Sequence, residues 1–198
     1  MSLAEEKNQG SATFQLLPEG VNCFDQLTNH NTRRSFFFEV DKHCQLGPNN
    51  YQQHGFGSVV CSLGASAIND SQPSLSVRGT PKKMSGNLVR SYKSGQLKQN
   101  IPLVFVTACQ IAWQDKHKFL EQFDLAANYM SRQKGLFSYR LYQATSQQED
   151  YQFINLAHWS GIEDFIGAFQ TNEFKSLIRG GFDQTSQIIV THPLTKFN

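Results

Sequence analysis

The sequence carries little charge of either sign. Charged residues make up 17% of its 198 residues, and the formal net charge is only +2. A surface so close to neutrality provides no strong attraction to nucleic acid or to an anionic membrane. We therefore expect neither as a partner.

Long apolar runs are also lacking. No stretch approaches the roughly 20 apolar residues that a membrane-spanning helix needs. The first residues are polar and acidic, unlike a secretory signal. The four cysteines, Cys23, Cys44, Cys61 and Cys109, show no paired spacing. These features predict a cytoplasmic protein with free thiols.

The pattern of a metal site is missing as well. His43, Cys44, His54 and Cys61 are the histidines and cysteines that lie near one another in the first half. Their spacing matches no usual zinc-ligand arrangement. We therefore expect no metal.

What is present is a globular composition. Apolar residues make up 39% of the chain, and 16 phenylalanines can fill a core. The length fits one large domain or two of about 100 residues each. The sequence suggests a disordered lead at 1–12, an irregular β-rich region at 13–100, and a more regular region at 101–198.

The region 13–100 predicts strands but no long helix. Strands are expected at 33–40, 57–63 and 74–78, separated by connections rich in glycine, proline and asparagine. This region either stands apart or completes the sheet of the second half. Residues 80–99 carry five lysines and arginines among polar residues, which favours a solvated linker or a positive rim for an anionic ligand.

The region 101–198 gives a clear order of elements. A buried strand is expected at 102–112, followed by a long amphipathic helix that begins near Asp115. Gly135 is a helix stop, and strands follow at 134–143 and 151–159. Two short helices and a last strand at 187–192 complete the order β-α-β-β-α-α-β. This order predicts an α+β fold with a four-stranded antiparallel sheet that has helices on one face. Its other apolar face needs a cover, so we expect a homodimer.

The strand at 151–159 organises this region. Side chains alternate along a strand, so Tyr151, Asn155 and Trp159 are expected on the face that the helices cover. His158 is expected on the opposite face, as a structural or interface histidine. Asn155 on a buried face is unusual, because a buried amide must find a hydrogen-bond partner.

Several segments of the second half resemble one known family. Residues 135–142, 153–159, 163–165 and 172–175 are similar to segments of the antibiotic biosynthesis monooxygenase superfamily. The resemblance covers roughly 101–198. It implies a ferredoxin-like, dimeric α+β barrel, and it is weak for the reaction because the superfamily also holds haem-degrading enzymes and quinol oxidases.

Two branches of that superfamily can be compared with this sequence. Its cofactor-free oxygenases of polyketide anthrones carry Asn-x-x-x-Trp and a later arginine, which Asn155, Trp159 and Arg179 match in spacing. A tyrosine of those enzymes is replaced here by Phe165, which removes a hydroxyl. The haem-degrading branch needs a tryptophan and a histidine where this chain has Ala168 and Ile178. The resemblance therefore implies no haem and no other cofactor.

The candidate site follows from these matches. The resemblance implies Asn155, Trp159 and Arg179 as catalytic residues, able to stabilise an enolate or phenolate that itself reduces oxygen. Phe165, Tyr139 and Tyr142 are the candidate substrate-binding residues. Each also has a purely structural explanation: Trp159 as a core residue, Asn155 in a structural hydrogen bond, and Arg179 near a helix end.

Three functions remain open from the sequence. The first is cofactor-free oxidation of a small aromatic enol, anthrone or quinol by O2. The second is a non-catalytic dimeric ligand-binding or stress-response module of the same fold. The third is that residues 13–100 perform the function and the second half only dimerises. Phe165 favours the second and the Asn155, Trp159 and Arg179 set favours the first.

Overall fold

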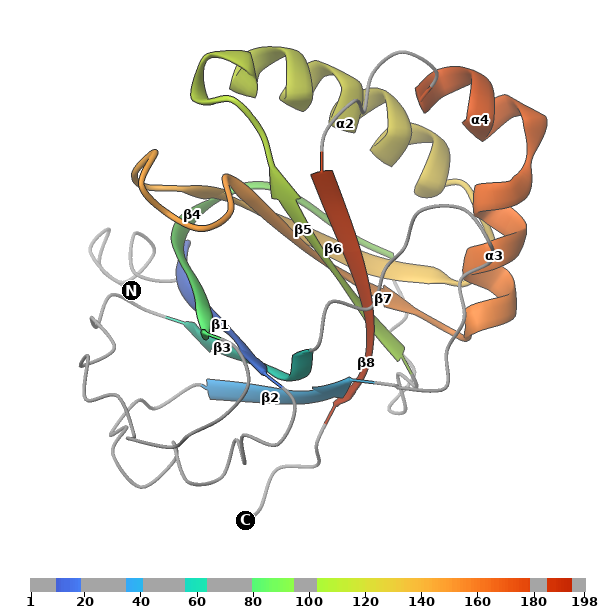
Figure 1. The fold of residues 1–198 in the computed structure, drawn as a ribbon. Coiled ribbons are helices and arrows are strands. Elements are labelled where there is room, and N and C mark those ends of the chain that lie inside the picture. The colour runs from blue at the N-terminus through green and yellow to red at the C-terminus, as the bar shows by residue number, and fades with distance from the viewer. Residues whose placement is uncertain are drawn as a thin grey trace, which may run out of the picture.

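The computed structural model describes residues 10–18, 35–40, 56–63, 80–94, 103–178 and 185–193 (Figure 1). The strand expected at 74–78 and most of the lead expected at 1–12 lie outside these residues. No helix in the described part is both long enough and apolar enough to cross a membrane.

The strands form one closed antiparallel barrel in the order β1-β3-β2-β8-β5-β7-β6-β4. Closure satisfies the backbone groups that an open sheet leaves unpaired at its edges. The strands are β1 (Ser11–Pro18), β2 (Ser35–Val40), β3 (Phe56–Leu63), β4 (Lys82–Lys93), β5 (Leu103–Gln110), β6 (Leu136–Ala144), β7 (Phe153–Trp159) and β8 (Thr185–Pro193).

The two halves of the chain contribute four strands each, in the same arrangement. Around the barrel the first half has the order β4-β1-β3-β2 and the second half has the order β8-β5-β7-β6. Both orders are 4-1-3-2 when the strands are numbered one to four within each half. The halves join where β4 pairs with β6 and where β2 pairs with β8. The chain is therefore two ferredoxin-like sheets joined edge to edge.

Three helices cover the second half of the barrel on its outside: α2 (Lys116–Met130), α3 (Ile162–Gln170) and α4 (Asn172–Ile178) (Figure 1). A short 3-10 turn, η2 (Trp113–Asp115), leads into α2. The α+β fold and the order β-α-β-β-α-α-β are confirmed. Asp115 does occupy the N-cap position of α2, but its side chain makes no capping hydrogen bond.

The barrel interior is filled by side chains from both halves. Phe14 from β1 and Tyr142 from β6 meet edge to face, with ring centroids 5.1 Å apart. Met84 of β4 and Ile154 of β7 belong to the same fully buried cluster. The apolar face for which a second copy was the expected cover is therefore covered by the N-terminal half of the same chain. The homodimer stays a prediction, and closing this barrel does not require one.

The segment 80–99 differs from the sequence expectation. Its described part forms β4, the longest strand, rather than a linker. Two of its basic side chains pair with acids: Lys82 Nζ lies 3.0 Å from Asp150 Oδ1, and Arg90 Nε lies 2.8 Å from Asp124 Oδ1. Arg90 thereby joins a strand of the first half to α2 of the second.

The turn between α2 and β6 depends on Gly135. Its φ of +92° is a conformation that other residues rarely adopt. A Cβ on Gly135 would also lie 2.5 Å from Ser160 Oγ and 2.6 Å from Asp164 Cβ, at the start of α3. The Ser160 hydroxyl in turn donates to the Asp164 carboxylate. This close approach fixes α3 against the α2–β6 turn.

We predict that Gly135→Ala lowers the free energy of unfolding by about 1–3 kcal/mol, from strain and contact together. The matched control is Gly167→Ala in α3, where a Cβ would meet nothing within 4 Å. That change should raise stability by about 0.5–1 kcal/mol, because alanine is the better helix former. Urea unfolding of both variants measures the difference, and equal effects would contradict the role of the turn.

We also predict that Phe14→Ala, in the N-terminal half, lowers the stability of the C-terminal half by about 3–5 kcal/mol, because the two share one core. The reporter is the fluorescence of Trp159, which is 2% exposed, in a Trp113→Phe background. If the halves folded independently, the urea midpoint reported by Trp159 would not move.

Candidate functional site

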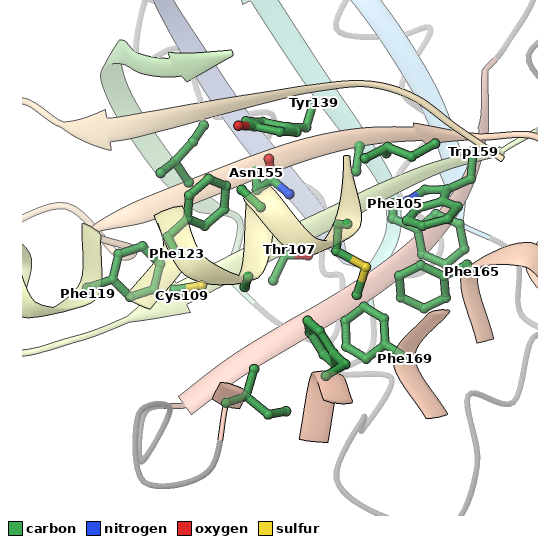
Figure 2. Close-up of a pocket in the computed structure, with 18 residues that line it drawn as sticks. Phe105, Thr107, Cys109, Phe119, Phe123, Tyr139, Asn155, Trp159, Phe165 and Phe169 are labelled. Atoms are coloured by element: carbon green, nitrogen blue, oxygen red, sulfur yellow. The ribbon is translucent and has the colours of Figure 1, made fainter. Parts of the chain in front are cut away.

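A pocket lies between the outer face of the second half of the sheet and the three helices (Figure 2). Strands β5, β6 and β7 form its floor, and α2, α3 and α4 form its walls and roof. The cavity measures about 170 Å³ and is mostly apolar. The residues that line it are Phe105, Thr107, Cys109, Phe119, Phe123, Ala126, Ala127, Met130, Leu136, Tyr139, Leu141, Asn155, Ala157, Trp159, Phe165, Phe169, Phe174 and Ile178.

Asn155 lies in the middle of the floor, as the alternation along β7 predicts. Its Oδ1 is buried and has no hydrogen-bond partner among the described residues. An unpaired buried polar atom costs about 1–3 kcal/mol, so native structures seldom retain one without a reason. The expectation that Asn155 makes a structural hydrogen bond therefore finds no support in the described part of the chain.

Aromatic rings crowd the end of the pocket near Trp159. Phe165 stacks on Phe105 with ring centroids 3.8 Å apart, and it meets Trp159 edge to face at 5.5 Å. The ring centroid of Phe169 lies 4.5 Å from that of Phe165. Phe165 is thus a core residue of the wall, held from both sides.

The pocket contains no fixed charge among its described lining residues. Cys109 and Tyr139 are its titratable members. Burial raises the pKa of the Cys109 thiol to about 12. Burial, and then the Asp124 carboxylate, raise the pKa of Tyr139, against the opposing effect of Arg90. Both groups are therefore neutral at pH 7, and the thiol is no nucleophile.

The structure brings four predicted site residues together: Asn155, Trp159, Phe165 and Tyr139 all line this pocket. Tyr142 does not join them. It lies in the barrel interior, because it is an odd number of residues from Tyr139 and so points to the other face of β6.

Two further predictions have different outcomes. Arg179 lies outside the described residues, so its place in the site stays a prediction. Tyr151 was expected on the face of Asn155, but it precedes β7 and packs into the barrel interior.

Thr107 is a pocket residue that the sequence reading missed. It lies directly opposite Asn155 on the neighbouring strand β5. Alternation from Leu103 would have placed it on the helix-covered face, where it is the one hydroxyl of its strand. The pairing of Thr107 with Asn155 could not be predicted from the sequence, because the register between strands that are distant in the chain leaves no local sequence signal.

His158 faces the barrel side of β7, as expected. Its Nδ1 lies 3.1 Å from Ser138 Oγ on β6. Burial, and then the charge of Arg140, lower the pKa of His158 to about 4. The imidazole is therefore neutral at pH 7 and lies outside the pocket.

Metal-binding chemistry has no visible centre in the described residues. No group of three or more histidine, cysteine, aspartate or glutamate side chains that could hold an ion occurs there. Cys61 and Cys109 are buried free thiols. His43, Cys44 and His54 lie outside the described part of the chain.

Solved structures share this architecture over nearly the whole chain. An anthrone oxidase-like protein superposes with a TM-score of 0.69 at 8% identity, covering 96% of this chain and 93% of its own. A ferredoxin-fold protein related to antibiotic biosynthesis monooxygenases, from Listeria monocytogenes 4b F2365, gives 0.56 at 13% identity, covering 96% and 98%. The haem-degrading enzyme LmHde from Listeria monocytogenes gives 0.52 at 12% identity, covering 92% and 98%.

The chain has the ferredoxin-like fold of the proteins related to antibiotic biosynthesis monooxygenases. The similarity spans both halves, whereas the sequence resemblance reached only residues 101–198. No protein-family profile and no curated protein sequence matches the chain. At sequence identities this low, the similarity establishes the fold and does not establish the activity, which depends on the residues of the pocket.

The lowered pKa of His158 predicts an acid-sensitive fold. Between pH 6.5 and 4 the unfolded chain takes up a proton that the folded chain does not, so stability falls as the pH falls through this window. The loss reaches about 3 kcal/mol near pH 4. His158→Gln should reduce this pH dependence in urea unfolding. His117→Gln, at an exposed position of α2, should not, and equal pH profiles for both variants would contradict the assignment.

Proposed function

We propose that this protein is a monooxygenase-like enzyme that oxidises a small aromatic enol, anthrone or quinol with O2 and without a cofactor. The observation that carries the proposal is the Asn155 amide in the floor of an apolar pocket, whose buried, unpaired Oδ1 can accept a hydrogen bond from the O–H of an incoming enol or quinol. The fold shared with an anthrone oxidase-like protein supports the same class of reaction.

The chemistry rests on the substrate rather than on a protein-bound redox group. An enolate or phenolate can itself give an electron to O2. Oxidation to a carbonyl of an anthrone's ring methylene, or of the ring C–H para to a phenol oxygen, then consumes one O2, leaves one oxygen atom in the product and releases the other as water. The protein has to bind the substrate, exclude water and stabilise the developing anion.

Asn155 and Trp159 are the groups suited to that task. The Asn155 amide offers a donor as well as an acceptor, and the Trp159 indole offers an N–H. The apolar walls around them lower the local dielectric, which strengthens a hydrogen bond to an oxyanion. Arg179 would add a positive charge if it reaches this pocket.

A haem does not fit the described pocket. No histidine lines it in the described part of the chain, and the Cys109 thiol is protonated. Ala168 is buried in α3 and Ile178 ends α4. Neither side chain can coordinate iron.

A non-catalytic binding module is the second candidate. Phe165 lacks a hydroxyl, and no carboxylate or imidazole lines the described pocket to remove a proton from the substrate. These features favour binding without turnover. The unpaired Asn155 is expected in either case, so oxygen uptake has to decide between the two candidates.

We predict that Asn155→Ala lowers kcat for O2 uptake with hydroquinones and anthrones by about 10²–10³-fold, the usual loss for one oxyanion donor. Stability should not fall, because the Oδ1 loses no hydrogen bond. Asn128→Ala, at an exposed position of α2, is the matched control and should keep full activity. Unaltered turnover in Asn155→Ala would show that the site is wrong, and absence of uptake by the parent protein would favour the binding module.

A further inference from the structure

The pocket floor is built from rows of side chains that cross neighbouring strands. One row runs Leu141, Asn155, Thr107, and the next runs Tyr139, Ala157, Phe105. Side chains directly opposite each other on paired strands lie about 5 Å apart at Cβ. The polar groups of Thr107 and Asn155 are therefore neighbours in the floor, and Tyr139 lies one row away from them (Figure 2).

None of these three groups has a hydrogen-bond partner in the described part of the chain. The Oδ1 of Asn155 is fully buried. The Thr107 and Tyr139 hydroxyls open into the same cavity. A buried acceptor without a partner, with two half-buried hydroxyl side chains in the same apolar pocket, indicates a ligand that supplies the missing partner.

The ring of Tyr139 is held in place by aromatic rings on two sides. Tyr92 of β4 stacks on it with ring centroids 5.8 Å apart, and Phe123 of α2 meets it edge to face at 5.6 Å. The Tyr92 hydroxyl points away from the pocket and donates to the Ser131 carbonyl at 3.2 Å. A strand of the N-terminal half therefore fixes one wall of the pocket.

Ala157 makes the hollow between Tyr139 and Phe105. Its small side chain sits between two aromatic rings in the same row. The resulting cavity of about 170 Å³ is close in size to an engineered cavity of about 150 Å³ that binds benzene. This volume suits one or two aromatic rings.

The charge of the pocket limits the ligand further. No cation lines it among the described residues, and Tyr139 and Cys109 are neutral. The described lining residues therefore offer an ionised carboxylate or phosphate no charged partner. A hydroxyl group, in contrast, can donate to Asn155 Oδ1 and accept from the Thr107 or Tyr139 hydroxyl.

We propose that the pocket selects a hydroxylated aromatic molecule of one or two rings, and that Thr107 and Tyr139 are specificity-determining residues that bind its hydroxyl together with Asn155. This inference deepens the proposed function by limiting the substrate to small hydroxyarenes. It concerns binding, so it can be tested without turnover.

The test is calorimetric titration of the full chain with 1-naphthol and with 1-methoxynaphthalene, which has the same rings but no O–H. Naphthol should bind about 10-fold more tightly, the effect of one or two hydrogen bonds. Thr107→Val and Tyr139→Phe should each weaken naphthol binding about 3- to 10-fold and leave the methyl ether unaffected. Thr107→Ser, which restores a hydroxyl, should recover the affinity for naphthol.

Controls separate the hydroxyl groups from the shape of the pocket. Thr145→Val removes an exposed hydroxyl that lies outside the cavity and donates to the Ser85 carbonyl, and it should not change either affinity. Ala157→Leu should abolish binding of both molecules by filling the hollow. The proposal would be overturned if naphthol and its ether bound equally, or if neither bound. It would also be overturned if both hydroxyl variants kept the parent affinity for naphthol. Equally tight binding of a three-ring hydroxyanthrone would contradict the limit on ring number.

The outcomes distinguish this proposal from the oxygenase. Selective naphthol binding without O2 uptake would refute the proposed function and leave the ligand assignment intact. Turnover of anthrones that is indifferent to Thr107→Val and Tyr139→Phe would support the oxygenase and refute the assignment.

Discussion

The rest of the structure depends on backbone pairing between the two halves of one chain. β4 pairs with β6 and β2 with β8, so neither four-stranded sheet has an exposed edge. The same pairing buries the inner faces of both sheets against each other, with Phe14 packed on Tyr142. Because the interior supplies this stability, the outer face of the second half is available for helices and a pocket.

The pocket places an unpaired amide where packing alone would favour an apolar side chain. Asn155 retains a buried oxygen without a partner in the described residues, in a pocket that is otherwise lined largely by rings such as Phe105 and Phe165. Under the proposed function, stability is given up at this one point to keep a hydrogen-bonding group available for the substrate. The Cys109 thiol and the Tyr139 phenol nearby are both neutral at pH 7, so the proposed recognition would use them as hydrogen-bonding groups and not as charges.

Local patterns were sufficient to predict the second half and, in the first half, the strands β2 and β3, but not β1 or β4. Alternation from 153 to 159 placed Asn155 and Trp159 on the helix side, and the helical periodicity after Trp159 predicted α3 and α4. β4 was mistaken for a linker because it is polar and contains Gly86, and its identity as a strand comes from pairing with distant β1 and β6. Thr107 was missed for a related reason: its importance arises from its position across from Asn155, which only the register reveals.

Joining two equivalent sheets in one polypeptide removes a restriction that identical subunits impose. In an assembly of two copies, every substitution is made twice and must be tolerated in both places. Here a change at Ala157 affects one half of the barrel and not the other, while a strand such as β4 can specialise in bracing Tyr139 through Tyr92. One half of the barrel can therefore acquire new ligand contacts while the other half preserves the scaffold.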